Sequence, residues 1–261
     1  MEDVQNQIDQ RNIPIDQVGI KNYKLPIFIP DKKNTKQSVV ADICVTVNLD
    51  PKNRGTHMSR LIEIMEEYKR EIFNYNMINL VLAEIKQQLD ATVAQISIDF
   101  DYFIEKESPI SKKNSLMAYQ TSLLAELDQN NILDFKIAIN VPVSSVCPCS
   151  KIISTKGAHN QRGLVNLNVS TDDFIYIEDL IEIIETKGGS SQIYSLLKRP
   201  DEKFLTEQMY DNPKFVEDIV RDLAVILNQD VRIKKYSVDC ENFESIHNHN
   251  AYAKIISQKK V

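Results

Sequence analysis

The sequence has little that would direct the chain to a membrane, to an oxidising compartment or to nucleic acid. No apolar run in its 261 residues approaches the roughly 20 residues that a membrane-spanning helix needs. The N-terminal MEDVQNQIDQRN lacks the basic and apolar regions of a secretory signal, so we expect the four cysteines to be reduced thiols in the cytoplasm. A net charge of −6 argues against bulk nucleic-acid binding, so a polyanionic ligand would need a local basic cluster.

The composition is that of a soluble globular protein. Hydrophobic residues make up 43% of the chain and charged residues 26%, which provides ample material for a core. The length suits one large domain or two of ordinary size.

Periodic apolar residues predict an alternation of strands and helices. Val39–Leu49 has an apolar residue at every odd position, as expected for a strand with one buried face. Residues 1–36 are polar and contain three prolines, which indicates an irregular N-terminal arm. The other expected strands are Ile96–Tyr102, Leu133–Val143, Val165–Val169, Val231–Cys240 and Ala251–Ile256, with Ser115–Leu127 as a hairpin partner; the expected helices are Leu61–Ile72, Met77–Leu89, Glu178–Thr186 and one that starts at Asn212 with Pro213 in its first turn.

This order occurs twice, as strand–strand–helix–helix–strand–strand. It predicts an α+β fold in which helices cover one face of an antiparallel sheet. The expected divisions are an arm at 1–36, a first module at 37–130 and a second module at 131–261.

The segment Val143–Gly163 carries the densest chemistry of the sequence. It contains Cys147 and Cys149, followed by His159 and by a polar stretch that ends at Arg162. Thiolate and imidazole are good ligands for a divalent transition metal, and three protein ligands with an open position make a hydrolytic centre. Two packed thiols are the alternative for the Cys-x-Cys pair.

A second polar patch lies near the C-terminus, in CENFESIHNHNAYA (Cys240–Ala253). It holds Glu244, His247 and His249, so three of the four histidines fall within the two patches. The fourth, His57, lies in the polar cluster RGTHMSR. Carboxylates and histidines supply acid–base groups near neutral pH, and the patches therefore contain the parts for metal-assisted hydrolysis.

Five separated motifs, in order, closely resemble the prokaryotic type IB GTP cyclohydrolases. They are RGTHMSR, SSVCPCSKIIS with GAHNQRG, LLKRPDEKF, NPKFVEDIVRD and ENFESIHNHNAYA. The resemblance covers the chain from about Val39 onward. It implies a tunnelling fold (T-fold) with two tandem modules in each chain and a homotetrameric assembly. It also implies hydrolysis of GTP to 7,8-dihydroneopterin triphosphate and formate, the first step towards folate and towards deazaguanine-modified tRNA.

The resemblance assigns roles in a metal site. Cys147 and His159 are the implied ligands, with Glu202 from RPDEK as the carboxylate and Asp201 as the competing choice. His247 is implied at the reacting water, as proton shuttle or as fourth ligand; Cys147, His159 and His247 are thus the expected catalytic residues. The implied cofactor is one Zn²⁺ or Mn²⁺ per site, without an organic cofactor, and a mixed ligand set does not choose between them.

Substrate contacts follow from the same resemblance. Guanine presents two parallel donors that one carboxylate accepts, and the T-fold places this carboxylate near a helix start, which points to Glu217. A solvated first-turn glutamate is the alternative. Glu244 is the second candidate, for base or ribose. The triphosphate needs basic side chains, and the candidates are Arg162, Lys198, Arg199 and Lys203, with Arg60 and His57 from a neighbouring subunit.

Cys149 stays open between a packed thiol and a redox partner of Cys147. The rival function within the T-fold is a deazaguanine nitrile reductase, which would use Cys147 as a nucleophile, with NADPH and no metal. A zinc deaminase lacks its H-x-E and P-C-x-x-C pattern here. A non-catalytic zinc-stabilised protein is a third alternative, although structural zinc sites are usually rich in cysteine.

Overall fold

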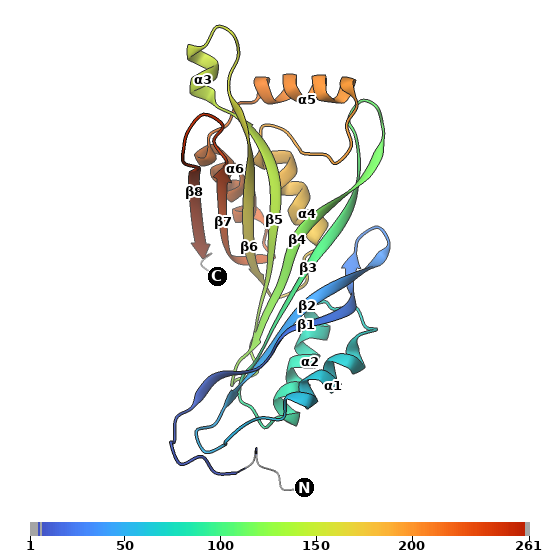
Figure 1. Cartoon of the computed structure of the whole chain (residues 1–261), viewed down its shortest axis with the longest axis vertical. Coiled ribbons are helices and arrows are strands. Elements are labelled where there is room, and N and C mark those ends of the chain that lie inside the picture. Colours follow the sequence, from blue (N-terminus) through green and yellow to red (C-terminus); the bar gives the residue numbers. More distant parts are fainter. Residues whose placement is uncertain (1–4, 6, 259–261) are drawn as a thin grey trace. The chain divides into compact units, whose positions relative to one another are not determined.

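A computed structural model describes residue 5 and residues 7–258 of the chain. Its strands form one eight-stranded sheet in which spatial order follows chain order, from β1 to β8 (Figure 1). The strands are β1 (Ile15–Asp31), β2 (Thr35–Leu49), β3 (Ala94–Glu107), β4 (Asn114–Leu127), β5 (Leu133–Val146), β6 (Asn160–Thr171), β7 (Ile233–Asn242) and β8 (Ala251–Gln258). The helices are α1 (Met58–Tyr68), α2 (Tyr75–Gln88), α3 (Pro148–Ile153), α4 (Ile177–Ile183), the π-helix η1 (Ile184–Gly188), α5 (Arg199–Asp211) and α6 (Val216–Gln229).

The chain divides into two compact units. The first unit comprises the described residues up to Asp101, with Ser122–Ile137 and Thr171–Phe174. The second unit comprises Tyr102–Thr121, Ala138–Ser170 and the described residues from Ile175 onward. The long strands β3, β4 and β5 contribute to both units, so this division differs from a single cut at residue 130. The two tandem modules stay a prediction from the sequence.

The apolar alternation found in the sequence is the core of the sheet. In β2 the side chains of Ala41, Ile43 and Val45 are completely buried, and in β5 Ile137 and Val141 are equally buried. Helix α6 turns its apolar side, including Ile219 and Leu223, into the second unit, where it packs against β7 and β8. The α+β class and the antiparallel sheet are confirmed, and the strand–strand–helix–helix–strand–strand order holds for β1–β4; in the second half, α3 lies between β5 and β6, and α5 adds a helix between β6 and β7. Ser115–Leu127 is a strand, as expected for the hairpin partner.

The N-terminal arm is the main correction to the expected elements. Residues Ile15–Asp31 form β1, which pairs with β2 in antiparallel register from Ile15 opposite Leu49 to Asp31 opposite Thr35. β1 is an edge strand, and an edge strand tolerates proline because one of its sides needs no donor. Pro26 and Pro30 therefore mark an edge strand, whereas the sequence pattern predicted irregular chain.

The helices of the second half also begin elsewhere than expected. Asn212 is the C-cap of α5, and α6 starts only at Val216. The carboxylate of Asp218 accepts a hydrogen bond from the N–H of Phe215 at 3.0 Å, which caps α6 at this later position. Helices α3 and α5 were not expected at all. In the part of the chain that the structure describes, no helix is long and apolar enough to cross a membrane.

Candidate active site

The polar motifs meet where β5 ends, β6 begins and β7 ends. The N–H of Cys147 donates to the carbonyl of His159 at 3.1 Å, which joins the two halves of the Cys–His motif. The N–H of Phe243 donates to the carbonyl of Arg162 at 2.9 Å, so the C-terminal patch lies beside the start of β6. The N–H of Lys214 donates to the carbonyl of Val146 at 3.1 Å, which brings the approach to α6 to the same place. All of these segments belong to the second unit.

Cys147 is half-buried at the N-cap of the short helix α3. Its Sγ accepts a hydrogen bond from the N–H of Ser150 at 3.4 Å, and the Ser150 hydroxyl accepts one from the N–H of His159 at 3.3 Å. Ser150 thus holds both expected ligands in one small loop. Gly157 adopts a φ of +133° in this loop, a conformation that favours glycine. Cys149 is exposed on α3, and both Cys147 and Cys149 are free thiols.

A buried amide network fixes the ring of His159. The Oε1 atom of Gln161 lies 3.0 Å from His159 Nδ1, and Gln161 Nε2 donates to the Ser145 hydroxyl at 2.8 Å. Asn242 Nδ2 donates to the same hydroxyl at 2.9 Å. Because Nε2 of Gln161 faces Ser145, Oε1 is the atom that faces the ring and accepts from Nδ1–H. The Nε2 lone pair of His159 is then available to a ligand, the arrangement that metal-binding histidines use.

The close approach of Asn242 explains a glycine in β6. A Cβ atom on Gly163 would collide with the carboxamide oxygen of Asn242 and crowd Val143. The thiol of Cys240 donates to the same oxygen at 3.7 Å, and burial raises the pKa of this thiol to about 12. Cys240 is therefore a protonated, structural thiol behind the site.

Two more groups of the C-terminal patch lie beside His159. Glu244 Oε2 is 3.7 Å from His159 Nδ1, and both side chains are nearly buried. The ring of His247 lies edge-on to His159, with centroids 6.4 Å apart, and it stacks on His249 at 5.1 Å. The structure thus places Glu244 and His247 beside His159, whose backbone is hydrogen-bonded to Cys147; the roles of these residues stay predictions.

Glu202 borders the same motif. It lines a cavity of about 390 Å³ together with Arg162 and the neighbouring Asn160 and Gln161. Its carboxylate also pairs with Arg199 at 3.2 Å and is about half exposed. Glu202 is therefore adjacent to the His159 motif and accessible from solvent.

Asp201 is fully engaged by the protein itself. Its Oδ1 accepts from the N–H groups of Ile110 and Ser111, each at 2.8 Å, and its Oδ2 accepts from the Ser111 hydroxyl at 2.5 Å and from the N–H of Lys198 at 2.8 Å. Burial alone would raise the pKa of Asp201, but these hydrogen bonds outweigh it and hold the pKa well below its usual range. Asp201 caps α5 and ties it to the β3–β4 turn, which leaves Glu202 as the accessible carboxylate of the pair.

Asp201→Asn should therefore affect the stability of the fold, and Glu202→Gln should affect metal binding. A carboxylate whose folded pKa is depressed contributes stability that is present above its unfolded pKa of about 3.9 and is lost as pH falls through the folded pKa. Asp201→Asn should lower the melting temperature by several degrees at pH 7, and the deficit should shrink below pH 4. Glu202→Gln should keep the melting temperature and lose bound metal. Thermal unfolding at several pH values and metal analysis measure both; a destabilised Glu202→Gln with full metal would contradict the division.

The basic candidates of α5 lie on its exposed side. The Arg199 side chain is 94% exposed next to Glu202, and Lys203 lies 3.8 Å from Glu207. Lys198 is the exposed N-cap residue of the helix. The phosphate role of these three residues stays a prediction, whereas Arg162 is the basic residue placed in the wall of the cavity.

Glu217 occupies the first turn of α6 and is exposed. The N-terminal hydrogen bond of that helix goes to Asp218, so Glu217 is not the capping carboxylate. The bond between Lys214 and Val146 places this helix start beside the strand that leads into Cys147. Its role as the guanine anchor stays a prediction.

His57 and Arg60 belong to the first unit. His57 is the N-cap residue of α1, and Arg60 in its first turn donates to the carbonyl of Gln88 at 2.8 Å. Their contribution to a site in another subunit stays a prediction.

The donor set suits a borderline divalent metal, although its members are not drawn together tightly. Among the described residues, no three His, Cys, Asp or Glu side chains converge closely enough to hold an ion. The chemistry nevertheless fits, because Cys147 offers a thiol, His159 offers an oriented Nε2, and His247 and Glu202 border the same motif. Gln161, Ser145 and Asn242 were not assigned roles from the sequence, since nothing in their spacing shows that they meet.

Comparison with known proteins identifies the family of this chain. The family model described as type I GTP cyclohydrolase folE2 matches residues 1–253. The GTP cyclohydrolase FolE2 of Syntrophotalea carbinolica is 50% identical over 255 residues, covering 98% of this chain and 94% of that protein. The GTP cyclohydrolase FolE2 of Syntrophobacter fumaroxidans is 48% identical over 259 residues, covering 99% and 100%.

Among solved structures, urate oxidases share the fold. A uricase from Bacillus fastidious matches with a TM-score of 0.58 at 8% identity, over 96% of this chain and 94% of that one. Urate oxidase from Bacillus subtilis 168 matches with a TM-score of 0.52 at 10% identity, over 93% and 98%. At such low identity these structures establish the tunnelling fold alone. The match of the family model and the relatives of about half identical sequence show that this chain belongs to the type I GTP cyclohydrolase family.

Proposed function

We propose that this chain is a metal-dependent GTP cyclohydrolase of type IB. It converts GTP and water to 7,8-dihydroneopterin triphosphate and formate in folate biosynthesis, and the product also feeds deazaguanine modification of tRNA. The observation that carries the proposal is the Cys147–His159 loop, with Glu244 and His247 beside it, in a chain that matches this family over almost its full length.

Residues of the second unit divide the work. Cys147, His159 and Glu202 would hold the metal, and the bond from Gln161 orients His159 for this. A divalent ion, when bound, supplies Lewis acidity that makes water a nucleophile near neutral pH. His247, exposed beside His159, moves protons during ring opening and formate loss. Glu217 accepts both guanine donors, and Arg162 with neighbouring basic side chains binds the triphosphate.

Activity with added metal tests the function. After treatment with a chelator, the chain is incubated with GTP and either Zn²⁺ or Mn²⁺, and formate and the fluorescence of the oxidised pterin are measured. We expect both products only after metal addition, because the thiolate, imidazole and carboxylate set suits either ion. Metal-independent consumption of NADPH with a deazaguanine nitrile would instead support the nitrile reductase.

The site is also proposed to be shared between subunits of a cytoplasmic homotetramer. Arg60 and His57 lie in the first unit, while the expected metal ligands lie in the second. Arg60→Ala should therefore raise the KM for GTP by tenfold or so with little change in bound metal, as expected when one charged contact is lost. Steady-state kinetics and metal analysis measure the two effects.

Complementation decides whether Arg60 acts across subunits. Arg60→Ala and Cys147→Ala chains are refolded together and assayed at a GTP concentration well below the KM of Arg60→Ala, where neither variant alone has appreciable activity. A fraction of mixed oligomers should contain one intact composite site. Recovery of activity supports the shared site. A mixture that stays inactive although mass measurement shows mixed oligomers would contradict it, and so would a fully active monomer.

A further inference from the structure

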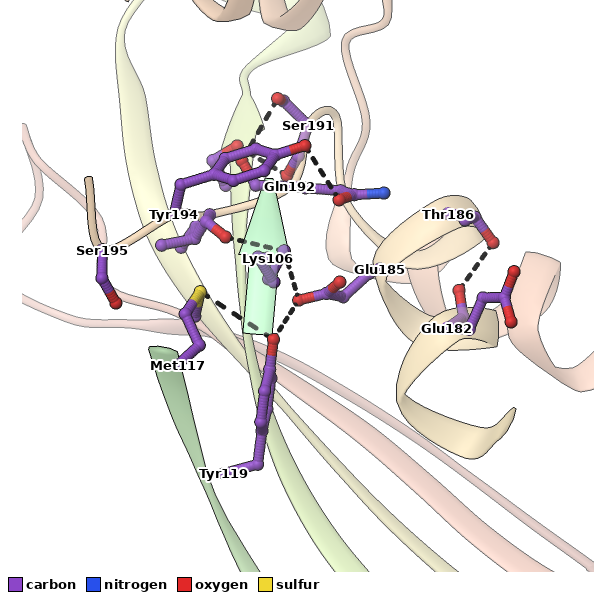
Figure 2. A network of polar contacts seen from close by, with 12 residues as sticks. Lys106, Met117, Tyr119, Glu182, Glu185, Thr186, Ser191, Gln192, Tyr194 and Ser195 are labelled. Carbon is purple, nitrogen blue, oxygen red and sulfur yellow. Dashed lines mark hydrogen bonds and ion pairs between the residues drawn. The ribbon is translucent and has the colours of Figure 1, made fainter. Parts of the chain in front are cut away.

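A buried lysine lies beside the cavity of Glu202 and Arg162, and the chemistry proposed above does not use it. Lys106, near the end of β3, has only 8% of its side chain exposed. Its Nζ donates to Glu185 Oε1 at 2.7 Å and to the carbonyl of Ile193 at 2.8 Å, and it lies 4.3 Å from the centroid of the Tyr194 ring. Figure 2 shows Glu185 and Tyr194 on either side of Lys106.

The partner carboxylate is held as firmly as the lysine. Glu185 projects from η1 with 9% of its side chain exposed, and its Oε1 also accepts from the Tyr119 hydroxyl at 2.5 Å. Burial, reinforced by Glu185, raises the pKa of Tyr119 far above its usual range, so its hydroxyl stays a donor. A buried ion pair is weak evidence for stability as such, because desolvation offsets its attraction. The Lys106–Glu185 pair is therefore better explained by a role other than stability.

The bond to the Ile193 carbonyl indicates this role, because Ile193 belongs to an irregular segment that forms part of the cavity. Gln192, Ile193 and Tyr194 line the same 390 Å³ cavity as Glu202 and Arg162. The segment lacks the regular hydrogen bonds of a helix or strand, so its carbonyl depends on a donor from elsewhere. Lys106 provides this donor and, with the same amine, a cation–π contact to Tyr194.

The segment presents a defined set of polar groups. The Tyr194 hydroxyl donates to Gln192 Oε1 at 3.1 Å, and in Figure 2 the amide nitrogen of Gln192 points away from Tyr194. At its start, the Ser191 hydroxyl donates to Gln208 Oε1 of α5 at 3.0 Å. The carboxamide oxygen of Gln192 therefore already accepts a hydrogen bond from Tyr194, and Gln192 has its N–H₂ group left to donate. Such a donor suits a ligand rich in oxygen acceptors.

We propose that Lys106, held by Glu185 and Tyr119, is a positioning residue that fixes Gln192 and Tyr194 as the substrate-contacting wall of the nucleotide site. This rests on the proposed function, since it takes GTP as the occupant of the cavity. The wall is preformed by the ion pair, so substrate binding does not have to order it.

The test removes the amine of Lys106 and keeps an aliphatic side chain of similar length. Lys106→Met should raise the KM for GTP by on the order of tenfold or more, because displacing substrate-contacting groups by small distances weakens productive binding. The kcat should change little, since the metal motif is untouched. Glu185→Gln retains an acceptor for Tyr119 and should show the same effect in milder form, which also covers the case that Lys106→Met does not fold. Lys36→Met is the matched control, because Lys36 lies 3.8 Å from the Phe28 ring centroid in the first unit and its removal should leave the KM unchanged.

A second readout follows the wall without turnover. The chain has no tryptophan, so Leu196→Trp, at a partly exposed position two residues beyond Tyr194, gives a single fluorescent reporter. Adding Lys106→Met should lower the fluorescence anisotropy of that reporter in folded protein, and GTP should raise it again. Gln192→Ala combined with Lys106→Met should raise the KM less than the product of the two single effects.

Failure of the proposed role of Lys106 can be told apart from failure of the proposed GTP cyclohydrolase function. A folded Lys106→Met or Glu185→Gln chain with a lower melting temperature but unchanged KM and anisotropy would overturn it, leaving the ion pair as a structural contact. Independent, multiplicative effects with Gln192→Ala would also overturn it. If the unaltered chain releases no formate from GTP, the proposed function fails and the substrate assignment with it, while anisotropy still decides whether Lys106 holds the wall.

Discussion

Replacing Cys147 by alanine is expected to abolish GTP turnover and to leave the purified chain with little metal. The Cys147 thiol is a candidate ligand, and Ser150 bonds to both Cys147 and His159 in the same loop. Without the ion, water loses the activation that lowers its pKa towards about 7, so we expect activity to fall by several orders of magnitude. His159→Ala should do the same. Metal analysis by mass spectrometry and formate release measure the two effects together.

The loss must be shown to be local. Cys44→Ala is the matched control, since Cys44 is a partly buried thiol in the first unit and should be replaceable without loss of metal or activity. Circular dichroism of Cys147→Ala should show the unaltered helix and strand content. Full metal occupancy and full activity in Cys147→Ala would refute the metal site and leave this residue as a packed thiol.

Glu217→Gln should remove most of the affinity for GTP while the metal stays bound. An amide offers one acceptor and one donor where guanine presents two donors, and a buried mismatch of this kind costs about 1–3 kcal/mol. At about 1.4 kcal/mol per tenfold change, this corresponds to roughly a fivefold to hundredfold rise in KM. Steady-state kinetics with GTP measures it, and metal analysis confirms that the site is otherwise intact.

The neighbouring carboxylate separates recognition from helix stability. Asp218 accepts the N-terminal hydrogen bond of α6, so Asp218→Ala should lower the melting temperature, by analogy with the loss of about 1 kcal/mol seen when a helix cap is replaced by alanine, and leave the KM for GTP unchanged. If Glu217→Gln also keeps its KM, Glu217 is only a favourable first-turn charge.

Elements with one buried face were predictable, and elements with little buried surface were not. The strand at Val39–Leu49 was found because alternate side chains are buried in it. β1 lies at an edge and its first half is largely exposed; only its second half alternates, at Leu25, Ile27 and Ile29, and there the prolines favoured irregular chain. In α5 only Asp201 and Leu205 are buried, which is too few for a helical stripe. The Asn212–Pro213 pair reads as a helix start from sequence, but tertiary contacts made it the end of α5.

The candidate site was predictable as far as it follows from neighbouring strand ends. The sequence put Cys147 and His159 in one motif and Glu244 among the candidate substrate contacts, and in the structure hydrogen bonding between the strand ends brings the segments of all three to one place. The choice between Asp201 and Glu202 could not be made from sequence, because it depends on N–H groups of the β3–β4 turn about ninety residues away. Lys106 and Glu185 are likewise 79 residues apart, and neither lies in a recognisable motif.

The π-helix η1 has a consequence for how chain length can vary in this family. A π-turn contains one residue more than an α-turn. The Thr186 hydroxyl of η1 donates to the carbonyl of Glu182 in α4 at 2.7 Å (Figure 2). Deleting one residue from Ile184–Gly188 would give a more regular helix, yet it would rotate Glu185 relative to the segment that follows by about 100°. The more regular helix would therefore move the Glu185 carboxylate away from the Lys106 amine. Relatives that have lost this residue should therefore also have replaced Lys106, and the two changes should be inherited together.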